Sequence, residues 1–317
     1  MLALDAITLR AGDPPLNHVF TDAAITVVLG ANRSGKTLLC RVIAGLTSPH
    51  SGELLLDDAP LASYLERPVA LVTQSFVNYP AWTVADNIAS PLTARGVARS
   101  VRDTKARDIA RKLGLEALLH RYPHELSGGQ QQRVAIGRAL AKGARVLVLD
   151  EPLVNLDYKL REALREELRG LLVAEGLTVI YTTTDPVDAF AMAHDVVLME
   201  DHGFVQSGAP LDVYRQPKSF TAAALMSEPT VNALSDGKTV GAIRPEHVRL
   251  TRPGDGAVKE LQLLVEEVET NGTHTFIHGL VGRDGWIVKV EGMVRAEIDR
   301  PLQVWVREAD ILRFESH

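Results

Sequence analysis

The chain has 317 residues, of which 46% are hydrophobic, so it can bury the cores of about two domains. Its 40 acidic and 34 basic residues give a net charge of −6, which argues against a chain-wide surface for nucleic acid or anionic membranes. The single cysteine, Cys40, excludes an internal disulfide framework and is typical of a reducing compartment, where a lone thiol usually packs as a small hydrophobe.

The sequence begins Met1-Leu2-Ala3-Leu4-Asp5, without a basic leader and a long apolar core, and contains no run of about 18 apolar residues. We therefore expect a chain that is neither secreted nor membrane-spanning by itself. Its ligands have to be inferred from local motifs.

Up to residue 226, short apolar runs alternate with helical stretches, which is the pattern of an α/β domain with a largely parallel sheet. The strongest predicted helix covers residues 158–174, where four leucines recur at helical spacing beneath a charged face. These leucines are Leu160, Leu164, Leu168 and Leu171. The predicted strands cover residues 24–29, 69–72, 145–149, 178–181 and 195–199.

An inserted helical lobe is predicted at about residues 76–126 of this domain, which we place at residues 1–229. From residue 115 to 141 the sequence is helical in character, but Tyr122-Pro123 and Ser127-Gly128-Gly129 interrupt it. A helix is predicted to follow the two glycines, over residues 131–141.

After Glu228-Pro229, alternating runs punctuated by glycine replace the α/β pattern. Residues 230–317 are therefore predicted to form a small C-terminal β-barrel domain, with a hairpin turn at Gly282-Arg283-Asp284-Gly285. His274 and His278 can share one face of a strand. A solvated face explains them better than a metal site, because no third ligand stands nearby in the sequence.

Residues 30–37 follow a predicted strand, open a helix and match the pattern G-x-x-x-x-G-K-[ST]. In this context the glycines let backbone N–H groups wrap phosphate oxygens, and the helix N-terminus adds its positive end. Lys36 is expected to reach the β- and γ-phosphates and Thr37 to bind Mg²⁺. A glycine turn that binds nothing is the alternative. The residues predicted to hold the nucleotide here are Gly30, Asn32, Ser34, Gly35, Lys36, Thr37 and Leu38.

A second apolar run, residues 146–149, delivers Asp150 and Glu151 to the carboxyl end of a strand, the edge where α/β sheets place ligands. Paired surface acids are common, but two acids that end an apolar strand downstream of a phosphate loop favour catalysis. We expect Asp150 to hold Mg²⁺ and Glu151 to be the catalytic base that orients and deprotonates water.

A third motif, Ser127, Gly128, Gly129 and Gln130, stands just before the predicted helix 131–141. A hydroxyl and bare backbone N–H groups at a helix N-terminus form a second grip for an anion. A chain that binds one nucleotide seldom needs two such anion-binding sites.

Together these motifs resemble the ATP-binding-cassette (ABC) family over residues 30–185. The resemblance implies a P-loop NTPase fold, with a RecA-like core, a helical subdomain and a small OB-like or TOBE-like barrel, and ATPase activity with ATP and Mg²⁺. It implies that residues 127–130 complete the site of a facing subunit in a head-to-tail dimer. By the same resemblance, Gln74 senses Mg²⁺ and the attacking water, and Asp157 belongs to the loop that crosses the dimer interface.

Further segments resemble the ATPase subunits of carbohydrate importers. Residues 74–80 and 83–88 are similar to the segment that receives the coupling helix of a membrane permease, and residues 243–247 look like the entry to a regulatory barrel. The resemblance implies permease partners, an indirect link to a substrate-binding protein, no nucleic acid, and a peripheral position on the cytoplasmic face of the inner (plasma) membrane. Thr184 with Pro186, residues 78–80 and residues 155–161 look most like the corresponding parts of bacterial glycerol importer ATPases, so glycerol is the leading substrate.

Two positions depart from the family pattern. The aromatic residue that stacks on adenine, a contact worth roughly 1–3 kcal/mol, is replaced by Ala11, and Phe20 is a candidate substitute. The family histidine after the strand at 178–181 is replaced by Thr184, a catalytic candidate that offers one hydroxyl and cannot become cationic. Loss of one donor to a developing oxyanion costs about 3–4 kcal/mol. Alternatively, this strand end is only a helix cap, with Asp185 and Pro186 starting the next helix.

These departures beside an intact Ser127-Gly128-Gly129 favour a heterodimer, in which a second ATPase subunit supplies the histidine. A homodimer with two modest sites is the alternative. Two other classes of function stay open. A soluble cassette ATPase that acts on ribosomes or DNA usually has paired cassettes or a coiled-coil arm, which this sequence does not show. A nucleotide-binding switch without hydrolysis is disfavoured by Glu151 and favoured by Thr184.

Overall fold

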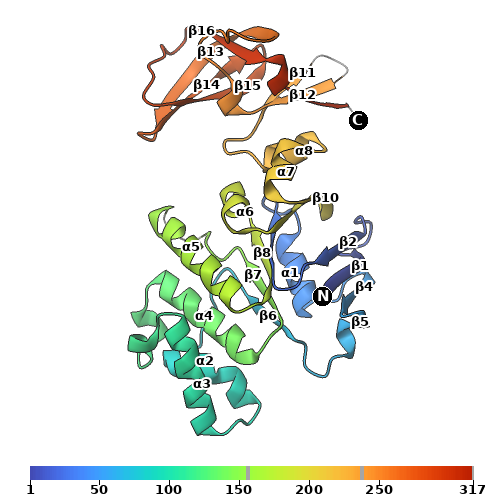
Figure 1. Cartoon of the computed structure of the whole chain (residues 1–317), viewed down its shortest axis with the longest axis vertical. Helices are drawn as coiled ribbons and strands as arrows, with labels where there is room; N and C mark the ends of the chain where they lie inside the picture. The colour runs from blue at the N-terminus through green and yellow to red at the C-terminus, as the bar shows by residue number, and fades with distance from the viewer. Residues whose placement is uncertain (155–157, 236–238, 316–317) are drawn as a thin grey trace. The chain divides into compact units, whose positions relative to one another are not determined.

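The structure is a computed structural model that describes residues 1–154, 158–235 and 239–315. It divides into two compact units, Met1–Leu211 and Asp212–His317 (Figure 1). Within the described ranges, none of the helices combines the length and the apolar character that a membrane span needs.

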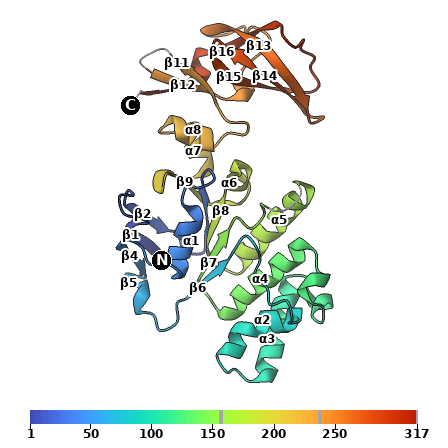
Figure 2. The same ribbon diagram turned by 180° about the vertical axis from the view of Figure 1, so that it is seen from behind.

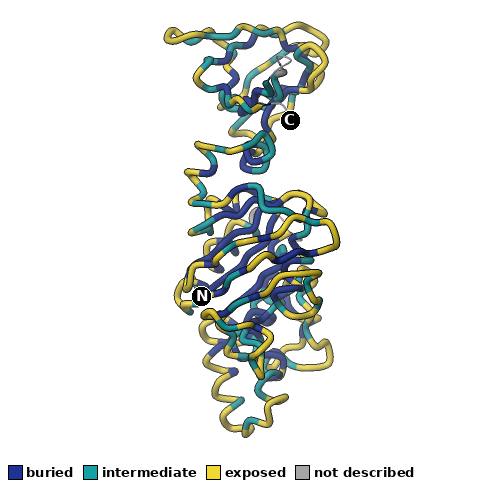
Figure 3. The backbone as a smooth tube through the Cα atoms, turned by 90° about the vertical axis from the view of Figure 1, so that its right-hand side faces the viewer, coloured by how far each residue is buried: buried dark blue, intermediate teal, exposed yellow. Residues whose placement is uncertain are grey.

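A six-stranded sheet forms the centre of the first unit, in the order β10-β9-β3-β8-β7-β6. Neighbouring strands from β9 to β6 are parallel, and β10 pairs antiparallel with β9. Every residue of β3 and β7 is buried, which explains their continuous apolar sequences. Figure 3 shows buried, dark blue segments running through the middle of the first unit. The strands are β3 (Ile25–Leu29), β6 (Val69–Val72), β7 (Val146–Asp150), β8 (Thr178–Thr183), β9 (Asp195–Glu200) and β10 (Gly203–Gly208). The five predicted strands are confirmed, with ends that differ by at most two residues.

A second, antiparallel sheet in the order β2-β1-β4-β5 was not predicted. It packs with α1 (Lys36–Ala44) and the central sheet around one core. That core contains Phe20 of the second sheet, Ile43 of α1 and Val148 of the central sheet, so the loop at residues 30–37 rests on a packed base. The strands are β1 (Leu2–Thr8), β2 (Leu16–Phe20), β4 (Ser51–Leu56) and β5 (Ala59–Pro60).

The helices of the first unit include a lobe in which α2 contacts both α3 and α4, as Figures 1 and 2 show from opposite sides. The predicted helix 158–174 is confirmed at both ends as α5. The helix predicted at 131–141 starts three residues earlier, because Ser127 caps it and Gln130 completes a capping box. The helices are α2 (Val84–Ala94), α3 (Arg99–Lys112), α4 (Gly128–Lys142), α5 (Tyr158–Ala174) and α6 (Pro186–Met192), with 3-10 turns at Leu61–Ser63, Glu116–Leu118 and Pro123–Glu125.

The second unit is a small β domain with two antiparallel sheets, in the orders β11-β12-β17 and β15-β14-β13-β16. Trp286, Ile277 and Val304 are fully buried in its core. Its strands are β11 (Asn232–Ser235), β12 (Thr239–Ile243), β13 (Val258–Thr270), β14 (His274–Val281), β15 (Asp284–Glu291), β16 (Pro301–Arg307) and β17 (Leu312–Glu315). The short helices are α7 (Pro210–Arg215), which crosses the boundary between the units in sequence, and α8 (Phe220–Leu225), with 3-10 turns at Pro245–His247 and Glu308–Asp310.

The predicted hairpin turn is confirmed between β14 and β15. Val281 pairs with Asp284, and Gly282 has a φ of 65°, which suits the turn. His274 and His278 lie on β14, both partly buried. Among the described residues, no group of three or more His, Cys, Asp and Glu side chains could hold a metal ion.

Candidate functional site

The loop of residues 30–37 connects β3 to α1 and forms the base of the candidate site. The backbone N–H of Gly30 donates to the carbonyl of Thr183 over 3.2 Å, which anchors the loop to the end of β8. A Cβ atom at Gly30 would lie 2.3 Å from the Met199 carbonyl oxygen, and Gly35 has a φ of 106°. Both positions therefore require glycine. The loop has the strand–loop–helix context that phosphate binding needs.

The Lys36 side chain is buried between this loop and the end of β7, with 3% of it exposed. Its Nζ donates to the carbonyl oxygens of Gly30 at 2.8 Å and Ala31 at 2.9 Å, and pairs with Glu151 at 3.2 Å. Ser34 Oγ is buried and has no hydrogen-bond partner within the described part of the chain. A phosphate oxygen would satisfy Ser34, because buried hydroxyls normally find a partner.

Asp150 ends β7 beside the loop and is buried. Its Oδ1 accepts hydrogen bonds from Thr37 Oγ1 at 3.2 Å and from Thr182 Oγ1 at 2.9 Å. Carboxylate and hydroxyl oxygens are the hard ligands that Mg²⁺ prefers. The donor set of Thr37 and Asp150 therefore fits a Mg²⁺ ion.

Glu151 follows Asp150 with a φ of 47°, a left-handed conformation that non-glycine residues rarely adopt and that often marks functional sites. Its backbone N–H donates to the Thr182 carbonyl at 3.2 Å and to the Thr182 hydroxyl at 3.1 Å. These bonds hold the turn through which the Glu151 carboxylate reaches Lys36.

A cavity of about 660 Å³ brings the loop, Glu151 and Gln74 together, and its size suits a small-molecule ligand. Gln74 also lines an adjoining cavity with Thr37 and Asp150. The lining of the first cavity is Arg10, Asn32, Arg33, Gly35, Lys36, Thr37, Leu38, Arg41, Gln74, Glu151 and His202.

Residues 127–130 do not line this cavity. The Ser127 hydroxyl accepts from the Gln130 N–H at 3.4 Å, and the Gln130 side chain accepts from the Ser127 N–H at 3.0 Å. Ser127 and Gly128 are exposed, so the start of α4 is open to an external ligand. Asp157, predicted at a dimer interface, lies outside the described residues.

Thr184 is exposed and lines a small recess that also includes Glu151 and Arg161. The helix cap predicted at this strand end is confirmed, and the catalytic role of Thr184 stays a prediction. Asp185 caps α6 by accepting from the Val187 N–H at 2.8 Å, and Pro186 is the first helical residue. Thr184 and Glu151 therefore share a recess next to a helix cap.

The preceding part of β8 is held by Asp188, whose role the sequence patterns did not reveal. Asp188 is buried and accepts from Arg165 Nε at 2.7 Å, Thr183 Oγ1 at 2.7 Å and Tyr181 OH at 3.2 Å. Burial, and then the negative charge of Asp188, raises the pKa of Tyr181 well above its usual value, so this phenol is a neutral donor. Asp188 thus fixes the strand end structurally.

Three basic residues of the cavity lining, Arg10, Arg41 and His202, were missed because they belong to no motif. His202 lies in the turn between β9 and β10, and its Nδ1 contacts Asp13 at 3.1 Å.

Ala11 is exposed, and Phe20 is fully buried in the core. Phe20 therefore cannot replace the missing adenine-stacking ring.

Cys40 packs as a small hydrophobic residue, as expected for the single cysteine of this sequence. It is fully buried in α1, and burial raises the pKa of its thiol well above the usual value. The thiol is therefore a packing group and no nucleophile.

The fold and the loop chemistry define a P-loop nucleotide-binding protein. The family model described as "ABC transporter" matches residues 15–154. The chain is 32% identical to the sulfoquinovosyl glycerol transport ATP-binding protein SmoE of Agrobacterium fabrum, over 93% of this chain and 90% of SmoE. It is 34% identical to the sn-glycerol-3-phosphate import ATP-binding protein UgpC of Vibrio vulnificus, over 92% of this chain and 85% of that protein.

Among solved structures, the fold matches the dimeric post-hydrolysis state of the ATP-binding cassette MJ0796 bound to ADP and Pi. The TM-score is 0.57 at 26% identity, over 66% of this chain and 99% of that cassette. The chain belongs to the ABC transporter family and is an ABC-type ATPase.

Proposed function

We propose that this ATPase is the ATP-hydrolysing subunit of an importer that takes up a carbohydrate or polyol through separate permease subunits. The observation that carries this proposal is the extent of the likeness to SmoE, which covers 93% of the chain and therefore most of the second unit as well as the cassette. The names of SmoE and UgpC both include glycerol as part of a larger solute. Glycerol, or a solute that contains it, is our leading substrate.

The cavity residues receive the following proposed roles. The triphosphate of ATP lies along the loop, where Lys36 and the hydroxyl of Ser34 contact its oxygens. Thr37, Asp150 and Gln74 would hold Mg²⁺, which would neutralise charge on the phosphates. The remaining loop contacts come from Gly30, Asn32, Gly35 and Leu38.

Glu151 is the proposed catalytic base. The Glu151 carboxylate pairs with Lys36 at 3.2 Å. The phosphate oxygens of ATP would compete with this carboxylate for the Lys36 ammonium group. Once Lys36 turns to phosphate, Glu151 is released to orient and deprotonate a water molecule. Gln74 and Thr184 position that water from two sides.

A dimer completes the site in this proposal. Ser127, Gly128, Gly129 and Gln130 bind the nucleotide of the facing chain, because they lie apart from the cavity that holds this chain's own loop. Asp157 is proposed to cross the same interface. A heterodimer is favoured, with a partner ATPase that supplies the histidine absent at Thr184, and a homodimer is the alternative. Mass spectrometry of the intact complex separates the two, since a complex with this ATPase alone, present twice, would rule out the heterodimer.

The proposed location follows from the permease partners. The chain is placed peripherally on the cytoplasmic face of the inner (plasma) membrane, with an indirect link to a substrate-binding protein. The exposed side chains of Tyr79 and Trp82 lie 4.5 Å apart between ring centroids and form part of the proposed permease contact.

The importer proposal is tested in the cell from which the chain comes. The gene is deleted and replaced by wild type, by Lys36→Ala or by Lys105→Ala, an exposed lysine on α3 that serves as the matched control. Uptake of labelled glycerol, sn-glycerol-3-phosphate and maltose is then measured. We expect wild type and Lys105→Ala to restore uptake of one solute that Lys36→Ala does not. Unchanged uptake of all three solutes after deletion would contradict the proposed substrate class.

A further inference from the structure

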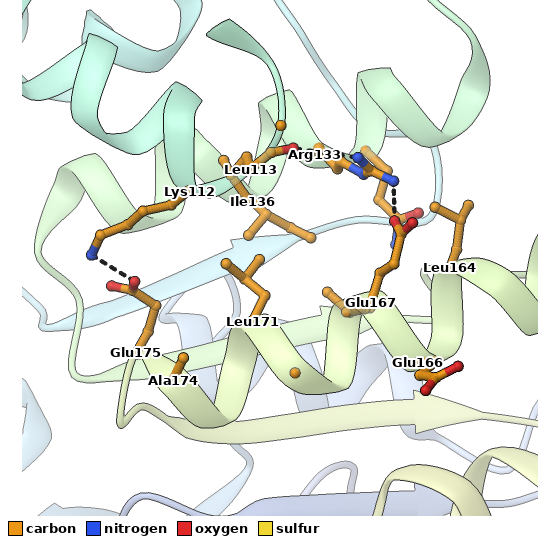
Figure 4. Close-up of a pocket in the computed structure, with 14 residues that line it drawn as sticks. Lys112, Leu113, Arg133, Ile136, Leu164, Glu166, Glu167, Leu171, Ala174 and Glu175 are labelled. Carbon is orange, nitrogen blue, oxygen red and sulfur yellow. Dashed lines mark hydrogen bonds and ion pairs between the residues drawn. The ribbon is translucent and has the colours of Figure 1, made fainter.

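A second cavity of the first unit, about 690 Å³ in volume, lies between α3, α4 and α5. It shares no lining residue with the nucleotide cavity. Leu113, Ile136 and Leu171 provide apolar walls, and Figure 4 shows Ile136 of α4 and Leu171 of α5 pointing toward one another. This volume and lining suit a small apolar ligand.

The charges around this cavity favour a neutral ligand. Lys112 pairs with Glu175 at 2.6 Å, and Arg133 pairs with Glu167, at opposite ends of the view in Figure 4. Both cations of the lining are thus already paired. An anionic ligand would lose hydration here without gaining an unpaired cation. The remaining acid of the lining, Glu166, gives a cationic ligand little, because Figure 4 shows its carboxylate turned away from Ile136 and Leu171.

One buried polar group in the lining calls for a hydrogen-bond acceptor. Gln132 is 2% exposed, and its Nε2 has no partner among the residues that the structure describes. A buried amide donor without an acceptor is unfavourable, so most such donors are satisfied by protein, water or ligand. A ligand oxygen can serve as that acceptor.

The cavity is joined to the 127–130 motif through Leu164. Leu164 lines the cavity from α5, and a Cβ atom at Gly129 would lie 2.8 Å from its Cδ1. The glycine therefore lets the start of α4 pack directly on the cavity wall. An occupant of the cavity that contacts Leu164 therefore contacts a side chain that packs on Gly129.

We propose that this cavity is a regulatory site for a neutral amphipathic small molecule, with an apolar ring or branched chain and one hydrogen-bond-accepting oxygen such as a carbonyl. The occupant accepts a hydrogen bond from Gln132 and fixes Leu164 against Gly129, and ATP turnover falls as a result. The effect on turnover rests on the proposed function, whereas the binding itself does not.

Binding is tested with 6-propionyl-2-dimethylaminonaphthalene, a neutral fluorophore with a fused-ring body and one carbonyl, titrated with the full chain. The matched variants are Gly170→Phe and Gly170→Ala, because Gly170 lines the cavity and a Cβ atom there has nothing within 4 Å. We expect saturable binding with emission at shorter wavelength for wild type and Gly170→Ala, and affinity at least about tenfold weaker for Gly170→Phe, which adds an aromatic ring at the cavity lining. Equal affinities of the two variants would overturn the site.

Gln132→Leu provides a second test, which decides the matter if Gly170→Phe does not fold. Loss of one hydrogen bond should weaken binding about fivefold. The unfolding temperature should not fall, because an apolar side chain replaces an unpaired buried amide. Undiminished affinity in a folded Gln132→Leu would overturn the proposed site, because the fluorophore would then bind without the Gln132 amide.

ATP hydrolysis by the assembled transporter, with and without saturating fluorophore, tests the regulatory part. Turnover should fall in Gly170→Ala and stay unchanged in Gly170→Phe. Unchanged turnover in Gly170→Ala at saturation would overturn the regulation while leaving the site. If the assembled transporter hydrolyses no ATP even without the fluorophore, the proposed function fails, and the binding titrations still decide whether the site exists.

Discussion

The ends of β7 and β8 lie side by side, with Asp150 paired to Thr182, yet they end in opposite chemistry. Two carboxylates, Asp150 and Glu151, lie at the end of β7, and three consecutive threonines, residues 182–184, lie at the end of β8. Thr182 donates to Asp150, and Thr183 donates to Asp188 and accepts from the Asp185 N–H at 3.0 Å. The hydroxyl groups of Thr182 and Thr183 thus bind the neighbouring acids and the start of the next helix. The third threonine, Thr184, is exposed in the recess beside Glu151.

The acids near the two ends also differ in their partners. Asp188 pairs with Arg165 at 2.7 Å, and Asp185 contacts Arg161 at 3.4 Å, so arginines neutralise the acids that follow β8. Asp150 accepts hydrogen bonds from two hydroxyl groups instead. A carboxylate that neutral donors position is suited to bind a cation from solution, and a carboxylate that an arginine satisfies is suited to hold the fold.

The largest effect is expected at the β7 end. Glu151→Gln should lower steady-state ATP hydrolysis by about 10²–10⁴-fold, because the amide cannot accept the proton of the attacking water. ATP binding should persist, since the amide has nearly the same shape, and a closed ATP-bound dimer should accumulate. Hydrolysis assays and light scattering check the two expectations, with the exposed Glu166→Gln on α5 as the control. Rapid turnover in Glu151→Gln would remove this residue from the role of base.

The next largest effect is expected at the β8 end, on stability. Asp188→Ala should lower the free energy of unfolding by about 3–5 kcal/mol, because it leaves the buried Arg165 guanidinium with only the longer contact to Asp185 at 3.4 Å. Asp188→Asn retains an acceptor for Thr183 and should cost less. Urea unfolding measures both variants. A loss below about 1 kcal/mol for Asp188→Ala would contradict the structural role of this acid.

A smaller effect is expected where the two strand ends meet. Thr182→Val removes the hydroxyl that joins Asp150 to the Glu151 N–H, and it should cost about 1–3 kcal/mol in unfolding free energy. Thr182→Ser retains the hydroxyl and is the control. If valine and serine variants unfolded at the same urea concentration, the hydroxyl bridge would contribute nothing measurable to stability.

The sequence predicted those features of the two strand ends that depend on residues close together in the chain. The loop at 30–37, the buried run of β7 and the cap at Asp185 each depend on residues within about ten positions, so spacing and apolar character predicted them. The Asp188 network joins Arg165, 23 positions earlier, to a strand and a helix, and no spacing rule encodes it. His202 reaches the nucleotide cavity only because β9 lies beside β3 in the sheet.

The second, antiparallel sheet escaped prediction for a different reason. β1 pairs with β2 and β4 through irregular registers that shift within the strand, so its buried side chains do not alternate strictly. β5 has only two residues. Such strands are defined by pairing across the chain, which a periodic pattern does not reveal.

The smallest effect is expected at Thr184, and it sharpens the comparison most. Thr184 is exposed, so Thr184→His and Thr184→Ala should each change the free energy of unfolding by less than about 0.5 kcal/mol. In the assembled transporter, Thr184→His should raise ATP turnover about tenfold, or ~1.4 kcal/mol in the barrier, because imidazole adds a donor beside Glu151 that threonine supplies weakly. Thr184→Ala controls for loss of the hydroxyl alone. An unchanged rate in Thr184→His would mean that another group already supplies the donor or that this site does not limit turnover, and a heterodimer with one slow site would lose its main support.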